Sequence, residues 1–258
     1  MVWDGHACPA CNEDITLEKE LESSIEKEKI HIKRRALRTV MNENHDRFIH
    51  RFPPEIASQI FIQCCPSSAF FDKWEATRSR RLCLGAVCQR WRQLAWATPE
   101  LWTSLRIALP PFQNNEELPQ LVSEWLERSS TLPLTVYLTV MHLDYHPGDA
   151  VFAQVINNLN NHSVRWHNVH FKLPARHLNR LCGSSQGSIL RTLVLSCIMY
   201  PWGEPNPSKL PTFTMKCKPS PTQLTLTRFN LASVDIFWNF ITVASFDDIS
   251  LDECIEFL

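Results

Sequence analysis

The sequence predicts an α+β protein in which an N-terminal helix and a small all-α domain precede a region of alternating short strands and helices. Residues 15–47 contain no proline or glycine and are rich in Glu, Lys, Arg and Leu or Ile, which is typical of a long helix. Apolar residues between positions 54 and 95 recur with helical spacing. After Pro110-Pro111, strand-like runs recur roughly every 20–35 residues, which indicates a repeating unit of strand followed by helix or loop.

The charge balance argues against a polyanionic partner. The chain has 26 Lys and Arg against 27 Asp and Glu, so its net charge of −1 creates no overall field toward nucleic acid or an anionic membrane. No stretch approaches the roughly 20 apolar residues that cross a bilayer, and the N-terminus lacks the pattern of a secretory signal. We therefore expect no nucleic-acid or membrane partner and a cytoplasmic or nuclear localisation.

Residue usage favours an interaction protein over an enzyme. Only 6 glycines occur, and they are too scattered to form a loop that cradles phosphate. The 9 Trp and 14 Phe supply much contact area with little backbone flexibility. The metalloprotease motif HExxH is missing. We expect a protein that is not an enzyme and that uses no cofactor.

The N-terminal 47 residues are expected to form a disordered tail, over 1–14, and a charged helix, over 15–47. Cys8 and Cys11 form a CxxC pair and are weak metal candidates, because zinc needs four ligands and no second pair follows at finger spacing. We therefore expect no bound metal. The helix carries a thin apolar stripe, with acidic residues through Glu28 and basic residues after it, so it is solvated or pairs as a coiled coil.

Two further helices are predicted in residues 48–109. Phe52-Pro53-Pro54-Glu55-Ile56 begins the first, because proline suits the first helical turn and Glu there suits the helix dipole. We expect a linker over 66–81. The second helix should run from about Leu82 through Ala95, where apolar residues recur on one face. A short turn over Pro99–Trp102 follows it.

Residues 112–258 are predicted to alternate helices and strands. The expected helices are Glu116–Arg128, Ala150–Leu159, Arg176–Cys182 and Val234–Ile241, and the expected strands are Leu134–Val140, Val169–Leu173, Leu190–Leu195, Leu224–Leu226 and Ala244–Ile249. Leu190-x-x-Leu193-x-Leu195 fits the start of the leucine-rich-repeat consensus, which indicates a short, irregular α/β solenoid of that kind. The amphipathic segment Leu251–Leu258 has no polar cap after it, so we expect either a truncated array or a final Phe257-Leu258 that packs back over the last apolar layer.

Residues 48–105 resemble the F-box-like domain of a large protein family of mushroom-type fungi. The resemblance is carried by FPPEI over 52–56 with Ile60-Phe61, by VCQRWRQLA over 87–95, and by TPELW over 98–102. It implies an intracellular substrate-recognition subunit of a Skp-cullin-F-box type ubiquitin ligase. In such a complex the F-box binds a Skp-family adaptor, and through it a cullin, while the repeats bind a target protein.

The resemblance also implies which residues face the adaptor. The expected contact residues are Pro53, Pro54, Ile56, Ile60, Phe61, Val87, Cys88 and Trp91. Packing in the protein's own core is the competing interpretation for Trp91. Two other functions stay open: a scaffold that binds proteins without joining a ligase, and a hydrolase or other enzyme built on the C-terminal region, which predicts a deep polar pocket with perturbed titratable groups.

Overall fold

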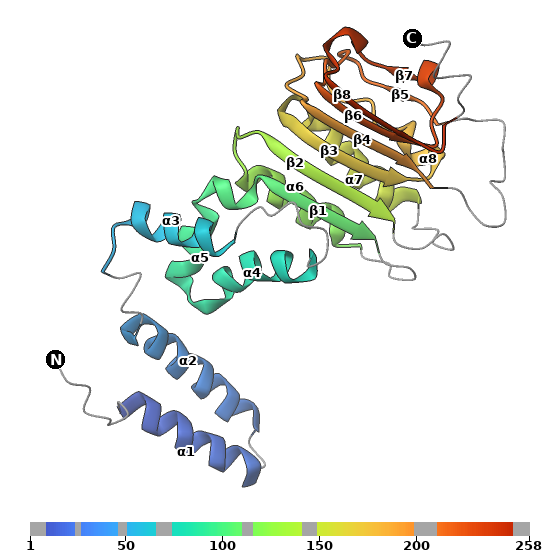
Figure 1. The fold of residues 1–258 in the computed structure, drawn as a ribbon. Coiled ribbons are helices and arrows are strands. Elements are labelled where there is room, and N and C mark those ends of the chain that lie inside the picture. The colour runs from blue at the N-terminus through green and yellow to red at the C-terminus, as the bar shows by residue number, and fades with distance from the viewer. Residues whose placement is uncertain are drawn as a thin grey trace. The chain divides into compact units, whose positions relative to one another are not determined.

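The computed structural model divides the chain into two compact units, Met1–Leu101 and Trp102–Leu258. The residues that it describes are 9–23, 27–45, 51–65, 74–109, 116–140, 149–198 and 211–249. The first unit is helical, and the second combines helices with a parallel sheet (Figure 1). The predicted α+β class is therefore confirmed. Within the described residues, no helix has the length and the hydropathy needed to span a bilayer.

The N-terminal segment forms two helices, α1 (Pro9–Ser23) and α2 (Lys27–His45), and not the single helix predicted over 15–47. Ion pairs join the two helices: Lys33 Nζ lies 2.8 Å from Glu13 Oε1, and Arg34 Nε lies 3.2 Å from Asp14 Oδ1. One straight helix would hold these partners far apart, because it rises about 1.5 Å per residue. Opposite charges along the chain thus pair between two helices, and α1 includes residues 9–14 of the expected tail.

The helices of the F-box-like segment are α3 (Pro54–Cys64), α4 (Trp74–Val87) and α5 (Gln89–Trp96). The predicted helix through Ala95 is broken at Cys88, which has an extended backbone (φ −155°, ψ 173°). Cys88 is the N-cap of α5, and its Sγ accepts a hydrogen bond from the backbone N–H of Trp91 at 3.5 Å. Arg92 Nε donates to the Gly85 carbonyl at 2.7 Å and so satisfies the end of α4. Helix α4 also begins inside the expected linker, at Trp74.

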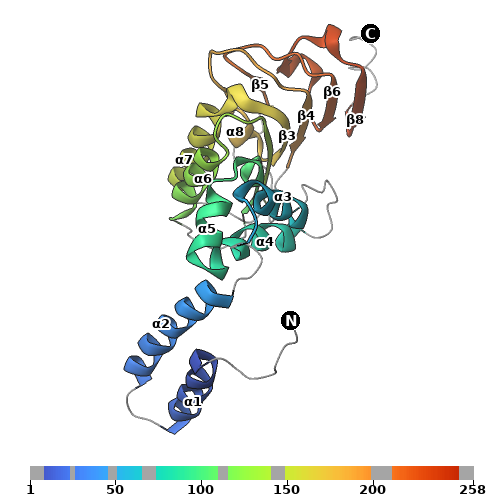
Figure 2. The same cartoon turned by 90° about the vertical axis from the view of Figure 1, so that its left-hand side faces the viewer.

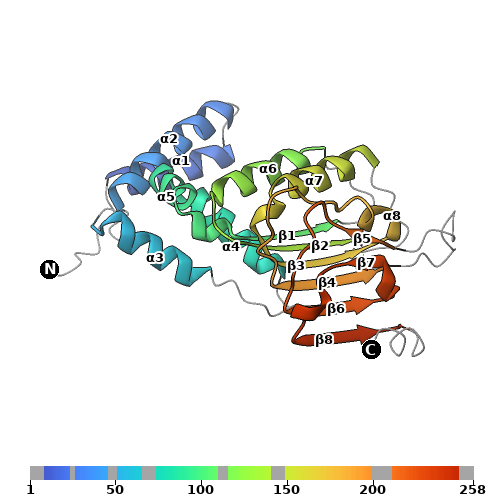
Figure 3. The same cartoon turned by 90° about the horizontal axis from the view of Figure 1, so that it is seen from above.

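The second unit contains a six-stranded sheet in which all neighbouring strands are parallel, in the order β1-β2-β3-β4-β6-β8. These strands are β1 Ser104–Leu109, β2 Leu134–Val140, β3 Trp166–Leu173, β4 Thr192–Cys197, β6 Gln223–Thr227 and β8 Val243–Asp247. A separate pair consists of β5 (Phe213–Thr214) and β7 (Val234–Asp235). Helices α6 (Leu118–Arg128), α7 (Asp149–Asn161) and α8 (Ala175–Leu178) lie on one side of the main sheet (Figures 2 and 3).

Alternation along the strands builds the core of this unit. In β2 the side chains of Leu134, Val136, Leu138 and Val140 are buried, and those between them are partly exposed. The buried set packs beneath the helices, because successive side chains of a strand point to opposite faces. The same pattern in β4 and β6 continues the core across the sheet. The face that points away from α6, α7 and α8 is called the outward face below.

The structure corrects several predicted elements of the second unit. Ser104–Leu109, assigned from sequence to the F-box-like domain, pairs with β2, so the unit boundary lies after Leu101 and not near residue 109. The helical pattern over Val234–Ile241 is wrong, because it forms β7 and a single 3-10 turn. The predicted strand Leu134–Val140 is confirmed to the residue. The segment Leu251–Leu258 lies outside the described residues.

Arg165 fixes the carboxyl end of α6 inside this unit. Its guanidinium donates to the Leu126 carbonyl at 3.0 Å, to Ser129 Oγ at 2.9 Å and to the Ser130 carbonyl. Its Nη2 also lies 3.1 Å from His162 Nδ1. Since an arginine only donates, His162 Nδ1 accepts and the imidazole is neutral. A buried cation at a helix carboxyl end satisfies carbonyls that the helix itself leaves open.

Candidate functional site

Helix α3 presents an apolar stripe to solvent. Phe52, Ile56 and Ile60 are spaced by four residues and have exposed fractions of 39%, 48% and 40%. Ile56 and Ile60 are spaced by four and lie on one face of α3, and Phe52 adds a third exposed side chain just before the helix begins. Ala57 and Phe61 lie about 100° around the helix from Ile56 and Ile60 and are buried. Proline at the start of α3 fixes where the helix begins and therefore which face each of these residues occupies.

The structure divides the predicted adaptor-facing residues into two groups. Pro53, Pro54, Ile56, Ile60 and Val87 are exposed, and Cys88 and Trp91 are half-buried. Phe61 is buried, with 1% of its surface exposed, and so cannot contact a partner directly.

Phe61 instead supports the stripe from below. Its ring packs on that of Trp91, with centroids 4.9 Å apart and planes tilted by 43°. A second link between the helix and the following segment is the hydrogen bond from Thr98 Oγ1 to Ser58 Oγ at 2.9 Å. The ring pair therefore fixes α3 against α5, and a substitution at either ring would disturb the stripe indirectly.

Three exposed apolar residues of the F-box-like segment were not predicted to belong to the site: Phe52, Leu82 and Trp96. Phe52 could have been found from sequence, because it precedes Ile56 and Ile60 at the same spacing. The exposure of Leu82 and Trp96 could not be predicted in this way. The apolar pattern predicts one continuous helix, whereas the structure has two helices, α4 and α5, separated at Cys88.

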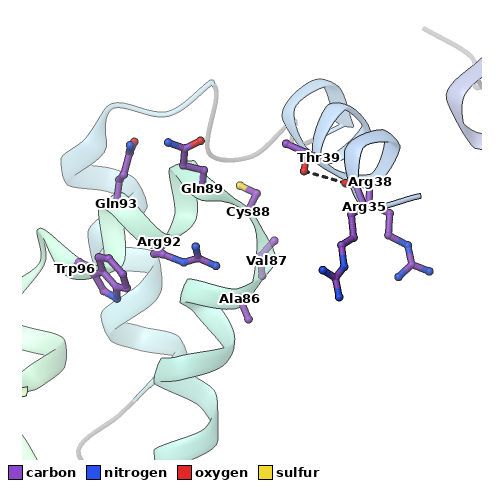
Figure 4. A pocket seen from close by; sticks show the side chains of 10 residues that line it. All are labelled: Arg35, Arg38, Thr39, Ala86, Val87, Cys88, Gln89, Arg92, Gln93 and Trp96. Atoms are coloured by element: carbon purple, nitrogen blue, oxygen red, sulfur yellow. Dashed lines mark hydrogen bonds between the residues drawn. The ribbon is translucent and has the colours of Figure 1, made fainter. Parts of the chain in front are cut away.

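A pocket of about 660 Å³ lies next to the predicted contact residues Val87 and Cys88 (Figure 4). Arg35 and Arg38 approach it from α2, and Arg92 from α5. Its other lining residues are Thr39, Ala86, Gln89, Gln93 and Trp96. No acidic side chain is among these lining residues, so the pocket is cationic.

The outward face of the sheet carries a ring stack that crosses three strands. The guanidinium of Arg106 lies over the ring of Tyr137, with its Cζ 4.4 Å from the centroid. The rings of Tyr137 and His170 are stacked, with centroids 4.3 Å apart and an interplanar angle of 16°. Burial, and secondly the charge of Arg106, lower the pKa of His170 to about 4. His170 is therefore neutral at pH 7 and can stack beside a cation.

Residues Gly183–Gly187 match the GxSxG pattern of a nucleophile elbow. That motif requires a sharp turn from a strand into a helix, with the serine at its tip. Here the segment runs in the opposite order, from α8 into β4. The local geometry is therefore not that of the hydrolase motif, although Ser185 is exposed on this loop.

Within the part of the chain that the structure describes, no group of three or more His, Cys, Asp or Glu side chains is placed to hold a metal ion. Cys8 lies outside the described residues. Cys11 lies in α1, but its side chain is not described. A metal at Cys8 and Cys11 therefore stays as weak a prediction as the sequence makes it.

Comparison with known proteins assigns no family to this chain. No protein-family model, no curated protein and no solved structure matches it.

Proposed function

We propose that the protein is a substrate-recognition subunit of a Skp-cullin-F-box type ubiquitin ligase. In this proposal α3, α4 and α5 bind a Skp-family adaptor, which connects the protein to a cullin. The second unit binds the target protein. The observation that carries the proposal is the exposed apolar stripe of Phe52, Ile56 and Ile60, which lies within the segment that resembles an F-box.

The stripe has the size of a binding hot spot. Each of its three side chains still exposes about two-fifths to one-half of its surface. Covering that remainder would stabilise a complex by about 1 kcal/mol per residue, since fully burying such a side chain contributes about 1.5–3 kcal/mol. Together with the cationic pocket beside Val87, the surface suits a partner with an apolar groove and an acidic margin.

The parallel strand order supports a repeat-type receptor in the second unit. Each inner strand of the main sheet pairs only with its two neighbours in the order, and β1 and β8 are the edges. Buried Leu or Val alternates with partly exposed residues in β2, β4 and β6. These features are typical of leucine-rich repeats, in which stacked strands present a continuous face to a ligand.

The proposed mechanism is proximity. The protein contributes no nucleophile, and the bound target is held near a charged conjugating enzyme. The gain comes from effective concentration, which a tether of suitable length raises to about the millimolar range. The rate of transfer then depends on how long the target stays bound, and not on an acid or base supplied by this chain.

Adaptor capture tests the proposal. The double variant Ile56→Arg/Ile60→Arg places two charges on the stripe, and we expect capture by a purified Skp-family adaptor to weaken at least about 100-fold. Leu121→Arg is the matched control, because Leu121 is exposed to a similar degree, 44%, but lies on α6. Trp91 is unsuitable for this test, since it packs on Phe61 and its loss would disturb α3 itself.

Equal capture of the double variant and the wild type would refute the assigned surface. Failure of the wild-type protein to bind any Skp-family adaptor would refute the ligase assignment and leave the alternative of a non-ligase scaffold. The control measurement is urea unfolding of each variant, which should match the wild type because both isoleucines are already substantially exposed.

A further inference from the structure

The outward face of the main sheet is a flat surface of short polar and aromatic side chains. Register pairs Ser104, Thr135, Asn168, Thr192 and Gln223 in one row across the strands. Hydrogen bonds within this row join Asn168 Nδ2 to Thr135 Oγ1 at 3.2 Å and Thr192 Oγ1 to Gln223 Oε1 at 3.0 Å. The row therefore forms a fixed ladder of donors and acceptors along one margin of the face.

The middle row is the ring stack. Arg106 pairs in register with Tyr137, and Tyr137 pairs with His170. Held by stacking on both sides, the phenol ring loses little freedom on binding, which reduces the entropic cost of using it as an anchor. The stack thus places a rigid, partly exposed phenol ring beside a fixed positive charge.

Charge on this face has one sign over most of its width. Arg106 lies in the middle row, and the exposed Lys172 lies two residues beyond His170 on β3. None of the outward residues described on β1, β2, β3, β4 and β6 is acidic, and Asp247 on the edge strand β8 is the first carboxylate. Since the whole chain has 27 acidic against 26 basic residues, this separation is a local property of the face.

We infer that the outward face binds an extended, acidic peptide segment of the target protein, with Arg106 and Lys172 pairing with its carboxylates and Tyr137 packing against its backbone. The inference deepens the proposed function and rests on it, because the proposed function assigns target binding to the second unit. It names the chemistry of that target: a segment rich in Asp and Glu.

Strand geometry sets the spacing of the carboxylates. Arg106 and Lys172 lie two strands apart and one row apart, which places their backbones about 12 Å from each other, given about 4.8 Å between strands and 3.3 Å per residue. An extended peptide covers that distance in about four residues. Acidic side chains roughly four positions apart would therefore meet both cations at once.

Direct binding of an acidic peptide tests the inference without the adaptor. The full-length protein is titrated into a fluorescein-labelled oligoglutamate peptide, and fluorescence anisotropy is followed at low and at high salt. We expect saturable binding that weakens as salt rises, because exposed charges are screened. An oligolysine peptide of the same length is the control for the sign of charge and should not bind.

Two sets of variants locate the site. Arg106→Gln/Lys172→Gln should weaken oligoglutamate binding about tenfold or more, whereas Arg180→Gln/Lys216→Gln removes the same charge from exposed positions off the face and should leave it unchanged. Ser196→Glu leaves both cations in place. It places a carboxylate beside Lys172, its register partner, and should weaken binding as well.

The inference is overturned if the Arg106/Lys172 variant binds oligoglutamate as tightly as the wild type, or if the wild type binds oligolysine equally well. Absence of oligoglutamate binding at low salt overturns it too. None of these results affects capture by the adaptor, which depends on Ile56 and Ile60. The fate of the proposed function is therefore read separately, from the adaptor assay.

Discussion

Replacing Arg165 with alanine should destabilise the second unit more than the loss of any other single cation that the structure describes there. The guanidinium is 9% exposed and serves the carboxyl end of α6 and the His162 imidazole at the same time. Truncation leaves the Ser130 carbonyl and the His162 ring nitrogen without this donor. The Leu126 carbonyl keeps one donor, Ser129 Oγ at 2.6 Å.

The expected loss is about 2–4 kcal/mol of unfolding free energy. Two hydrogen bonds from a charged donor contribute about 1.5–3 kcal/mol each, and a cation at a helix carboxyl end adds about 0.5–1 kcal/mol. Burial opposes this sum, because it disfavours the charged form and lowers the pKa of Arg165. Alanine also removes this desolvation cost, so the net loss lies below the combined range of about 3.5–7 kcal/mol, at about 2–4 kcal/mol.

Urea unfolding monitored by tryptophan fluorescence measures the effect, since Trp166 is adjacent and fully buried. Arg180→Ala is the matched control, because its side chain is exposed, and it should change stability by less than about 0.5 kcal/mol. Arg165→Lys should fall between the two, as an ammonium keeps the charge without the planar fork. If Arg165→Ala unfolds within about 0.5 kcal/mol of the wild type, the assigned role of Arg165 is wrong.

Three further outcomes are expected. Gly183→Ala should destabilise the protein by at least about 1 kcal/mol, because Gly183 has φ +60° and a Cβ there would lie 2.5 Å from a methionine methyl. Gly187→Ala, with open space around it, is the control and should have little effect in the same urea assay. Cys88→Ser should stabilise α5 by about 0.5 kcal/mol or more, measured by thermal unfolding, as a hydroxyl is the better N-cap. Burial lowers the pKa of both His162 and His170. Below about pH 6.5 these two histidines therefore gain protons in the unfolded chain first, and stability should fall as the pH drops. His170→Gln should flatten this dependence of stability on pH.

Local periodicity was sufficient to predict most of the second unit. The alternation in Leu134–Val140 identifies a strand with both of its ends, because one face of that strand is buried throughout. Periodicity failed where the stabilising partner is distant in sequence. The two-helix arrangement of α1 and α2 depends on ion pairs such as Arg34 with Asp14, 20 residues apart, and no local pattern contains them.

The candidate site was predictable in its position but not in its detail. The proline start of α3 and the spacing of Ile56 and Ile60 point to an exposed stripe, and the structure places both side chains at the surface. Phe61 follows Ile60 directly, so sequence could not tell which of the two faces outward without the helix phase. Arg106 gives no signal either, because its ring partner lies 31 residues later and is brought beside it only by strand pairing.

Each strand of the main sheet pairs only with its immediate neighbours in the order β1-β2-β3-β4-β6-β8. Gain or loss of one strand with its connection would therefore widen or narrow the sheet by about 4.8 Å and leave the remaining pairings in place. If the outward face binds a target peptide as proposed, duplicating or deleting an internal gene segment would change the length of peptide that fits this face. New specificity can then arise without redesign of the hydrophobic interior.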